Sequence, residues 1–134
     1  KLFLYLYGIV FQGTVIFAAL IFLVQLCLIL GISFILSATN VFFRDVENIL
    51  GIFLTLWMYL TPVIYSPQLV PERFKLLLSL NPMTGIINSY RNAIFFGIPP
   101  FGWDFLYSIV ISIIILILGF IYFRKRSKYF ADVI

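Results

Sequence analysis

The stretch between Lys1 and Arg44 contains no charged residue: residues 2–43 lack Asp, Glu, Lys, Arg and His. At a rise of 1.5 Å per residue, a helix of that length is far longer than the roughly 30 Å hydrocarbon core of a bilayer, so it fits more than one membrane-spanning segment. The whole chain is 63% hydrophobic and 10% charged, whereas a soluble domain has about 25% charged residues. The composition therefore excludes a soluble globular domain, excludes a disordered chain, and predicts an integral membrane protein.

The charge-free stretch is predicted to break at Gly8–Thr14, where glycine and polar residues cluster. Lys1–Tyr7 is then the end of one span and Val15–Ala38 a complete one. The alternative is one long tilted helix starting at Lys1, which would overrun even a strongly tilted span. Because the chain has no initiator Met and opens in apolar sequence, we expect it to be part of a larger membrane domain.

Val15–Ala38 carries two features that predict contacts with other helices. Gln25 lies in mid-span, where an unpaired amide is costly, so we expect an interhelical hydrogen bond or, less favourably, a place on a polar path. Small residues four positions apart allow close helix packing in lipid. They are Cys27 with Gly31, and Ser33 with Ser37.

Two further spans are predicted, at Ile49–Tyr65 and Phe105–Phe123, the second being almost entirely Ile, Leu, Val and Phe. Residues 124–134 follow as a tail. Its basic residues are Arg124, Lys125, Arg126 and Lys128. Basic residues flanking a span mark the cytoplasmic side, so we expect the carboxy terminus to be cytoplasmic.

Residues 71–97 contain two apolar segments that are each too short to cross a bilayer. Pro71–Leu80 and Met83–Phe96 are separated by Asn81-Pro82, and Thr84 is the expected N-cap of the second. Short helices joined in this way predict a re-entrant pair over residues 71–96. The alternative is one kinked span over Leu76–Phe96. The predicted fold is an all-α, polytopic transmembrane bundle with a re-entrant helix pair on the outer side.

The number of crossings then assigns each loop to a side of the membrane. If residues 71–96 re-enter, two spans separate the cytoplasmic tail from the charged turn at Arg44, so that turn is also cytoplasmic. Gln12–Thr14 and Ser66–Asp104 are then outside. Asp45 or Asn48 is expected to cap the helix that follows the turn.

The sequence shows no catalytic or metal-binding pattern. It has no His and a single Cys, Cys27, so no Cys/His spacing for a metal is present. Asp45 and Glu47 are two positions apart and do not share a helix face. The phosphate-binding loop G-x-x-x-x-G-K-[ST] is absent. We therefore expect a protein that is not an enzyme, that binds no nucleic acid and that takes its energy from a partner.

Four motifs occur in the order known from one family. They are Asn40-Val-Phe-Phe-Arg-Asp-Val46, Trp57-Met-Tyr-Leu-Thr-Pro-Val-Ile-Tyr65, Leu80-Asn-Pro-Met-Thr-Gly85 with Tyr90-Arg-Asn92, and Phe130-Ala-Asp-Val-Ile134. In these motifs the whole chain closely resembles the carboxy-terminal portion of the permease subunit of ABC-type polysaccharide exporters.

The resemblance implies a homodimeric permease in the bacterial or archaeal cytoplasmic (inner) membrane. Its partners would be membrane lipid, a second copy of the permease and a separate ATP-binding cassette subunit, which holds the ATP and Mg²⁺, so that this chain has no cofactor of its own. The substrate would be a lipid-linked glycan such as O-antigen, capsule or teichoic acid. The alternative is a truncated or non-transporting membrane assembly module.

The resemblance also implies three groups of site residues. The turn that couples to the ATPase is Phe43, Arg44, Asp45 and Glu47, with a simple topology anchor as the alternative. The translocation path is Trp57, Tyr59 and Tyr65, whose rings suit stacking on sugars but equally suit packing or an interfacial belt. The outer gate is Asn81, Pro82, Gly85 and Arg91, where Arg91 pairs either with a protein carboxylate or with an anionic phosphate.

Overall fold

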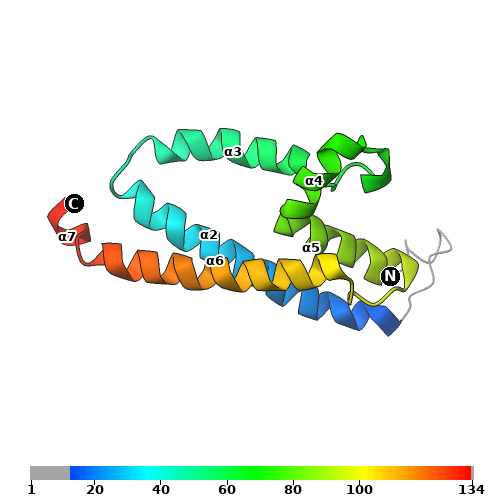
Figure 1. The fold of residues 1–134 in the computed structure, drawn as a ribbon. Helices are drawn as coiled ribbons and strands as arrows, with labels where there is room; N and C mark the ends of the chain where they lie inside the picture. The colour runs from blue at the N-terminus through cyan, green and yellow to red at the C-terminus, as the bar shows by residue number, and fades with distance from the viewer. Residues whose placement is uncertain (1–12, 134) are drawn as a thin grey trace, which may run out of the picture.

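The computed structural model describes residues 13–133, which form helices connected by loops and contain no strand. The expectation of an all-α chain is confirmed for this part. The predicted span end at Lys1–Tyr7, and most of the predicted break at Gly8–Thr14, lie outside the described residues. The elements follow in the order η1 (Gly13–Ile16), α2 (Phe17–Asn40), α3 (Val46–Leu60), η2 (Pro67–Leu69), α4 (Glu72–Leu80), α5 (Pro82–Arg91), η3 (Asn92–Phe96), α6 (Trp103–Ser127) and α7 (Phe130–Val133) (Figure 1).

Two long apolar helices, α2 and α6, form the body of the molecule. They have 24 and 25 residues, or about 36 Å at 1.5 Å per residue, enough to cross a bilayer. They run side by side in the same direction: the Phe17 ring packs on Phe101 at 5.3 Å, and the Phe34 ring packs on Phe120 at 5.8 Å. Compared with the predicted spans, α2 is shifted by two residues, and α6 continues into the basic tail.

The closest approach of α2 and α6 is at two glycines. A Cβ atom added to Gly31 would lie 2.6 Å from the Leu116 backbone nitrogen, and one added to Gly119 would overlap the Gly31 carbonyl. The expected close packing at Gly31 is therefore confirmed. Ser33 and Ser37, in contrast, are exposed on α2.

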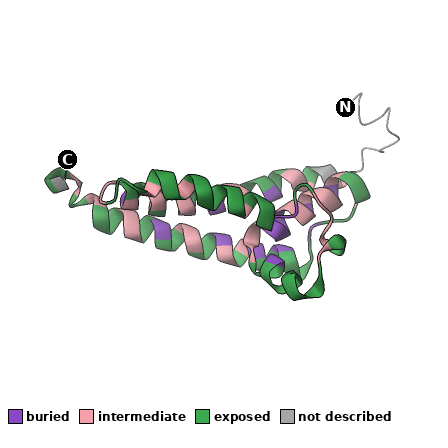
Figure 2. Ribbon diagram, turned by 90° about the horizontal axis from the view of Figure 1, so that it is seen from above, coloured by how far each residue is buried: buried purple, intermediate pink, exposed green. Residues whose placement is uncertain are grey.

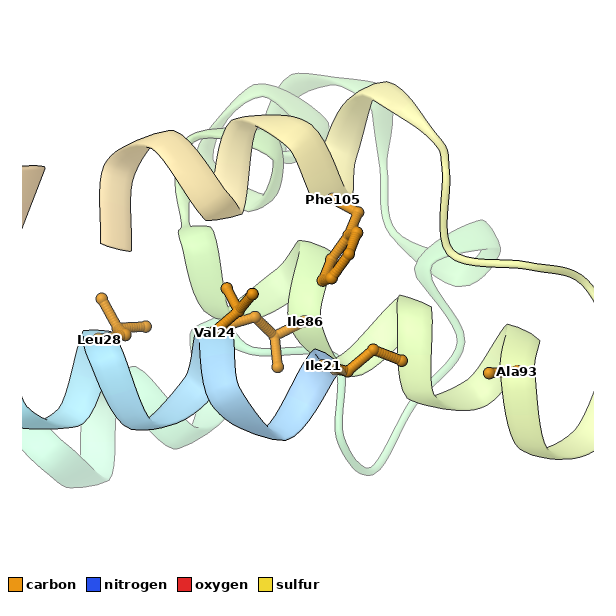
Figure 3. Close-up of a cluster of buried hydrophobic side chains, with 6 residues drawn as sticks. All are labelled: Ile21, Val24, Leu28, Ile86, Ala93 and Phe105. Atoms are coloured by element: carbon orange, nitrogen blue, oxygen red, sulfur yellow. The ribbon is translucent and has the colours of Figure 1, made fainter. Parts of the chain in front are cut away.

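The buried core lies where α2, α5, η3 and α6 meet (Figure 3). It consists of Ile21, Val24, Leu28, Ile86, Ala93 and Phe105. Outside this cluster most large apolar side chains are exposed, and Figure 2 shows that exposed and intermediate residues make up most of every helix. A protein surface this apolar is what a lipid environment requires.

Helix α3 ends five residues before the predicted boundary. The predicted span Ile49–Tyr65 is wrong at its carboxy-terminal end, because α3 stops at Leu60 and Thr61 is extended, with φ −101° and ψ 129°. The cause is local: the ring of Pro62 disfavours a helical conformation at the residue before it. None of the residues of α3 is buried, and the helix lies apart from the α2–α6 pair along most of its length (Figure 1).

The helices α4 and α5 break at Asn81-Pro82, as the sequence predicts. The predicted N-cap, however, is wrong: Asn81 caps α5 by accepting a hydrogen bond from the Met83 amide, and Pro82 occupies the first helical turn. Thr84 is buried instead, and its hydroxyl has no hydrogen-bond partner within residues 13–133. The segment between α3 and α6 begins and ends at the end of the molecule opposite the α2–α3 turn (Figure 1).

Candidate functional site

A polar cluster joins the end of α3 to the turn between α4 and α5. The indole nitrogen of Trp57 donates to the Asn81 side-chain oxygen at 3.1 Å, and the Asn81 amide nitrogen donates to the Thr61 hydroxyl at 3.0 Å. The same Asn81 oxygen accepts from the Met83 backbone amide at 3.0 Å. This orientation of the amide is required, because Trp57 and Met83 both offer only N–H donors. Asn81 therefore satisfies three partners on two elements.

The carboxy-terminal carbonyl groups of α3 and its loop are also bound by side chains. Thr61 donates its hydroxyl proton to the Trp57 carbonyl at 2.9 Å, and Arg91 donates to the Pro62 carbonyl at 2.8 Å. Pro62 is fully buried. Such carbonyls are left unpaired at a helix end unless a side chain or water reaches them. Arg91, expected to pair with a carboxylate or a phosphate, here binds a backbone carbonyl and has no carboxylate partner among the described residues.

The Asn81-Pro82 turn and α5 also pack tightly on the start of α6. The Ser108 hydroxyl lies 2.7 Å from the Pro82 carbonyl and 2.8 Å from the Asp104 carbonyl, and it has one proton to share between them. Tyr107 donates to the Leu80 carbonyl at 3.0 Å. A Cβ atom on Gly85 would overlap the Asp104 carbonyl and the Ser108 hydroxyl. Gly85 thus lies within α5, at the contact with α6, rather than in the turn.

The three aromatic residues predicted to line a path do not lie together. Trp57 faces Asn81 and a groove between α2 and α3 of about 440 Å³. Tyr59 and Tyr65 instead line a shallow pocket beside α4, where the Tyr65 hydroxyl donates to the Tyr59 carbonyl at 2.9 Å. The Tyr59 residue is 63% exposed. The structure therefore divides the predicted path residues between two faces of α3 and its following loop.

The predicted coupling turn lies at the other end of the molecule, beside the end of α6 (Figure 1). Phe43, Arg44, Asp45 and Glu47 are all exposed. The Phe43 amide donates to the Thr39 carbonyl at 3.0 Å, and the Val46 amide donates to the Phe43 carbonyl at 3.2 Å. Asp45 occupies the N-cap position of α3, but its side chain makes no capping hydrogen bond.

Gln25 makes the interhelical hydrogen bond that its mid-span position predicts. The Tyr90 hydroxyl, on α5, donates to its side-chain oxygen at 3.1 Å. Thr61 and Tyr107, which are not among the predicted site residues, donate their hydroxyl protons to the carbonyl groups of Trp57 and Leu80. Within residues 13–133, no three His, Cys, Asp or Glu side chains gather in a way that would hold a metal ion.

Comparison with known proteins identifies the family. Residues 2–95 match the family described as ABC-2 type transporter. Two curated relatives, both named O-antigen export system permease protein RfbA, come from Klebsiella pneumoniae and Myxococcus xanthus. Each is 32% identical to this chain, and each match covers 82% of this chain. The matched part makes up 42% of the Klebsiella pneumoniae protein and 43% of the Myxococcus xanthus protein. The chain thus spans less than half the length of these relatives.

Every predicted site residue, from Phe43 to Arg91, falls inside the matched residues 2–95. The two membrane-length helices, the apolar surface and this match agree with one another. The chain is an integral membrane protein and belongs to the ABC-2 type transporter family.

Proposed function

We propose that this chain forms part of the membrane-spanning permease subunit of an ATP-driven exporter of lipid-linked polysaccharide. The observation that carries the proposal is the similarity to O-antigen export permeases across 82% of the chain. The proposed substrate is a glycan of O-antigen, capsule or teichoic acid type, carried on a lipid.

In the proposed membrane arrangement, α2, α3 and α6 cross the inner membrane and α4 with α5 re-enters it from the outer side. Helices of 9 and 10 residues are only about 15 Å long, half of the hydrocarbon thickness. The segment between α3 and α6 starts and finishes at one end of the molecule, which supports re-entry rather than a kinked crossing (Figure 1). The basic end of α6 supports a cytoplasmic location for the carboxy terminus and, with it, for the α2–α3 turn.

A backbone that breaks inside the membrane needs partners for its free polar groups. The Asn81-Pro82 break meets this requirement: Asn81, Ser108 and Tyr107 bind the groups nearest to it. This supports a re-entrant outer gate formed by Asn81, Pro82 and Gly85, with Arg91 holding the gate to α3 through the Pro62 carbonyl.

The energy for export would come from a separate ATP-binding cassette subunit, which holds ATP and Mg²⁺, and the permease would act with a second copy of itself. The exposed turn of Phe43, Arg44, Asp45 and Glu47 would receive the motion of the ATPase.

Helix α3 leads directly from this turn to the gate, and it is bound to the rest of the described chain chiefly at the gate end, through Trp57 and Thr61. A shift of the turn would therefore reach the gate through α3. Trp57 would offer its ring face to sugars in the groove between α2 and α3, and Tyr59 and Tyr65 would do so in the pocket beside α4.

The experiment that tests the proposal is glycan export by cells carrying Arg44→Ala together with Asp45→Ala, at matched permease levels. Because coupling between sites typically amounts to a 5–150-fold effect, we expect export to fall roughly tenfold. Glu72→Ala is the control, since it removes an exposed charge whose ion pair with Lys75 contributes little. Unchanged export in the double variant would refute a coupling role for the turn. Loss of the gene without loss of surface glycan would refute export itself.

A further inference from the structure

Arg126, near the end of α6, lies against two aromatic rings, one of which also packs on a ring of α7. Its guanidinium carbon lies 5.3 Å from the centre of the Phe42 ring and 5.6 Å from that of Tyr122. The Phe130 ring, on α7, packs on Phe42 at 6.1 Å and on Phe123 at 5.7 Å. We call Phe42, Tyr122, Phe123, Arg126 and Phe130 the tail clasp. It joins the α2–α3 turn to the carboxy-terminal tail.

The tail clasp depends on ring contacts rather than on ion pairs. No carboxylate lies within ion-pair distance of Arg126 in the described part of the chain, whereas a guanidinium within about 6 Å of a ring centre is attracted by the ring electrons. A lysine cannot replace it fully, because the planar guanidinium stacks on rings and a compact, strongly hydrated ammonium does so less well. Each ring pair adds a further favourable contact.

The residues that the tail clasp holds next to one another are exposed, and they include both apolar and charged side chains. On the turn, Phe43 is 65% exposed and is flanked by the exposed charges of Arg44 and Asp45. On the tail, Lys128 and Asp132 are exposed as well. An apolar anchor within a rim of charges of both signs is typical of a protein–protein interface.

We propose that the tail clasp makes the α2–α3 turn and α7 into one docking surface for the ATP-binding subunit. This inference rests on the proposed export function, and it adds the carboxy-terminal tail to the contact. The turn is exposed, so a partner can push on it directly. Because the tail clasp joins the turn to α6 and α7, a force on the turn is transmitted to α2, α3 and α6 together.

Crosslinking in native membranes tests the clasp without any reference to transport. In a Cys27→Ser background, the pair Phe42→Cys and Phe130→Cys is treated with a short bis-maleimide. The matched control pair is Phe42→Cys and Ala131→Cys, because the next residue on α7 points in a different direction. We expect the first pair to crosslink several times more efficiently than the control. Equal efficiency, or no crosslink at position 130, would overturn the clasp.

Export and ATP hydrolysis by the complete permease–ATPase complex then test the docking role. Arg126→Ala and Phe130→Ala should each lower the glycan exported per ATP hydrolysed by about tenfold, because each variant removes a contact with Phe42 on the turn and one further ring contact of the clasp. Lys125→Ala is the matched control, since it removes the same charge from the same turn of α6 and, among the described residues, Lys125 has no ring at cation–π distance, so it should stay near wild type. Phe130→Tyr, which keeps the ring, should restore coupling.

The outcomes separate the two proposals. If Lys125→Ala impairs coupling as much as Arg126→Ala, charge alone matters and the docking inference is wrong. If the Arg44 and Asp45 variants impair export but the Phe130→Ala variant does not, the tail is not part of the docking surface, and the export function stands. If the crosslink forms but neither the turn variants nor the clasp variants affect export, the coupling role of the turn and the docking role of the tail are both wrong. The export function itself fails only if loss of the gene leaves the surface glycan unchanged.

Discussion

At the scale of the residue, Asn81 is the N-cap of α5, a role that was predicted for Thr84. Asn81 and Thr84 are both acceptable N-caps, but Pro82 is favoured in the first turn of a helix and so points to Asn81. The structure adds Trp57 and Thr61 as further partners of Asn81. Nothing in the local sequence specifies these two contacts, because they join residues 24 and 20 positions apart.

Replacing Asn81 tests this cluster. Asn81→Ala removes the cap and two side-chain hydrogen bonds, so it should cost about 2–3 kcal/mol of stability. Asn81→Asp keeps the acceptor for Met83 and Trp57 and should cost less. The measurement is the midpoint of thermal unfolding of the purified protein in detergent. Ser79→Ala is the control, since the Ser79 hydroxyl donates only to a carbonyl of its own helix; a cost for Ser79→Ala as large as for Asn81→Ala would contradict the prediction.

Replacing Gly85 tests the close contact between α5 and α6. The Cβ atom of Gly85→Ala would overlap the Asp104 carbonyl, which is backbone and cannot swing away. We expect the variant to lose roughly 1–3 kcal/mol, in the range of overpacked cores. Gly51→Ala, on α3, has nothing within 4 Å of the added atom, and should be neutral or stabilising. The same thermal midpoint distinguishes them, and equal behaviour of the two variants would argue against the α5–α6 contact.

At the scale of the element, α3 differs from its neighbours in how it is held. Helices α2 and α6 contact each other along their length through rings and glycines. Helix α3 has no buried residue and is held mainly at its end, where Trp57 and Thr61 bind Asn81 and Arg91 binds the following Pro62. A helix held at one end can pivot there without breaking other contacts.

Removing the hydrogen bonds at the carboxy-terminal end of α3 should make the whole helix open more often. In the double variant Trp57→Phe with Arg91→Gln, the indole and guanidinium donors are removed while ring and stem volume largely remain. We expect amide hydrogen exchange to rise severalfold across Val46–Leu60 and to stay unchanged in α2 and α6, because exchange reports opening of each unit separately. Tyr59→Phe is the control, since the Tyr59 hydroxyl has no hydrogen-bond partner among the described residues. Uniformly faster exchange in all three helices would contradict the prediction.

At the scale of the whole molecule, the two ends are formed by different elements. One end carries the α2–α3 turn and the basic end of α6 with α7, and the other carries the segment between α3 and α6 with its connection to α6 (Figure 1). This arrangement agrees with the sequence-based parity of the loops, in which the Arg44 turn and the tail share one side.

Cysteine labelling in intact cells tests the assignment of sides. In a Cys27→Ser background, Gln68→Cys and Ile98→Cys should react with an impermeant maleimide added outside. Arg44→Cys and Lys128→Cys should react only after the membrane is opened. Labelling of the Gln68 and Ile98 positions from opposite sides would show that the segment between α3 and α6 crosses the membrane, and would refute re-entry.

Hydropathy, proline and charge were enough to predict that the helices exist, the break at Asn81-Pro82 and the membrane class of this chain, because these properties act within a few residues; the end of α3 at Leu60 was not predicted. They also predicted that Gln25 needs a partner. Which helix faces meet became visible only in three dimensions: Arg91 binds a carbonyl, Trp57 binds Asn81, and Arg126 lies between Phe42 and Tyr122. A lipid-facing helix is apolar on every side, so its hydrophobic pattern does not mark the face that packs, and the contacts are set by how small and polar groups fit across helices.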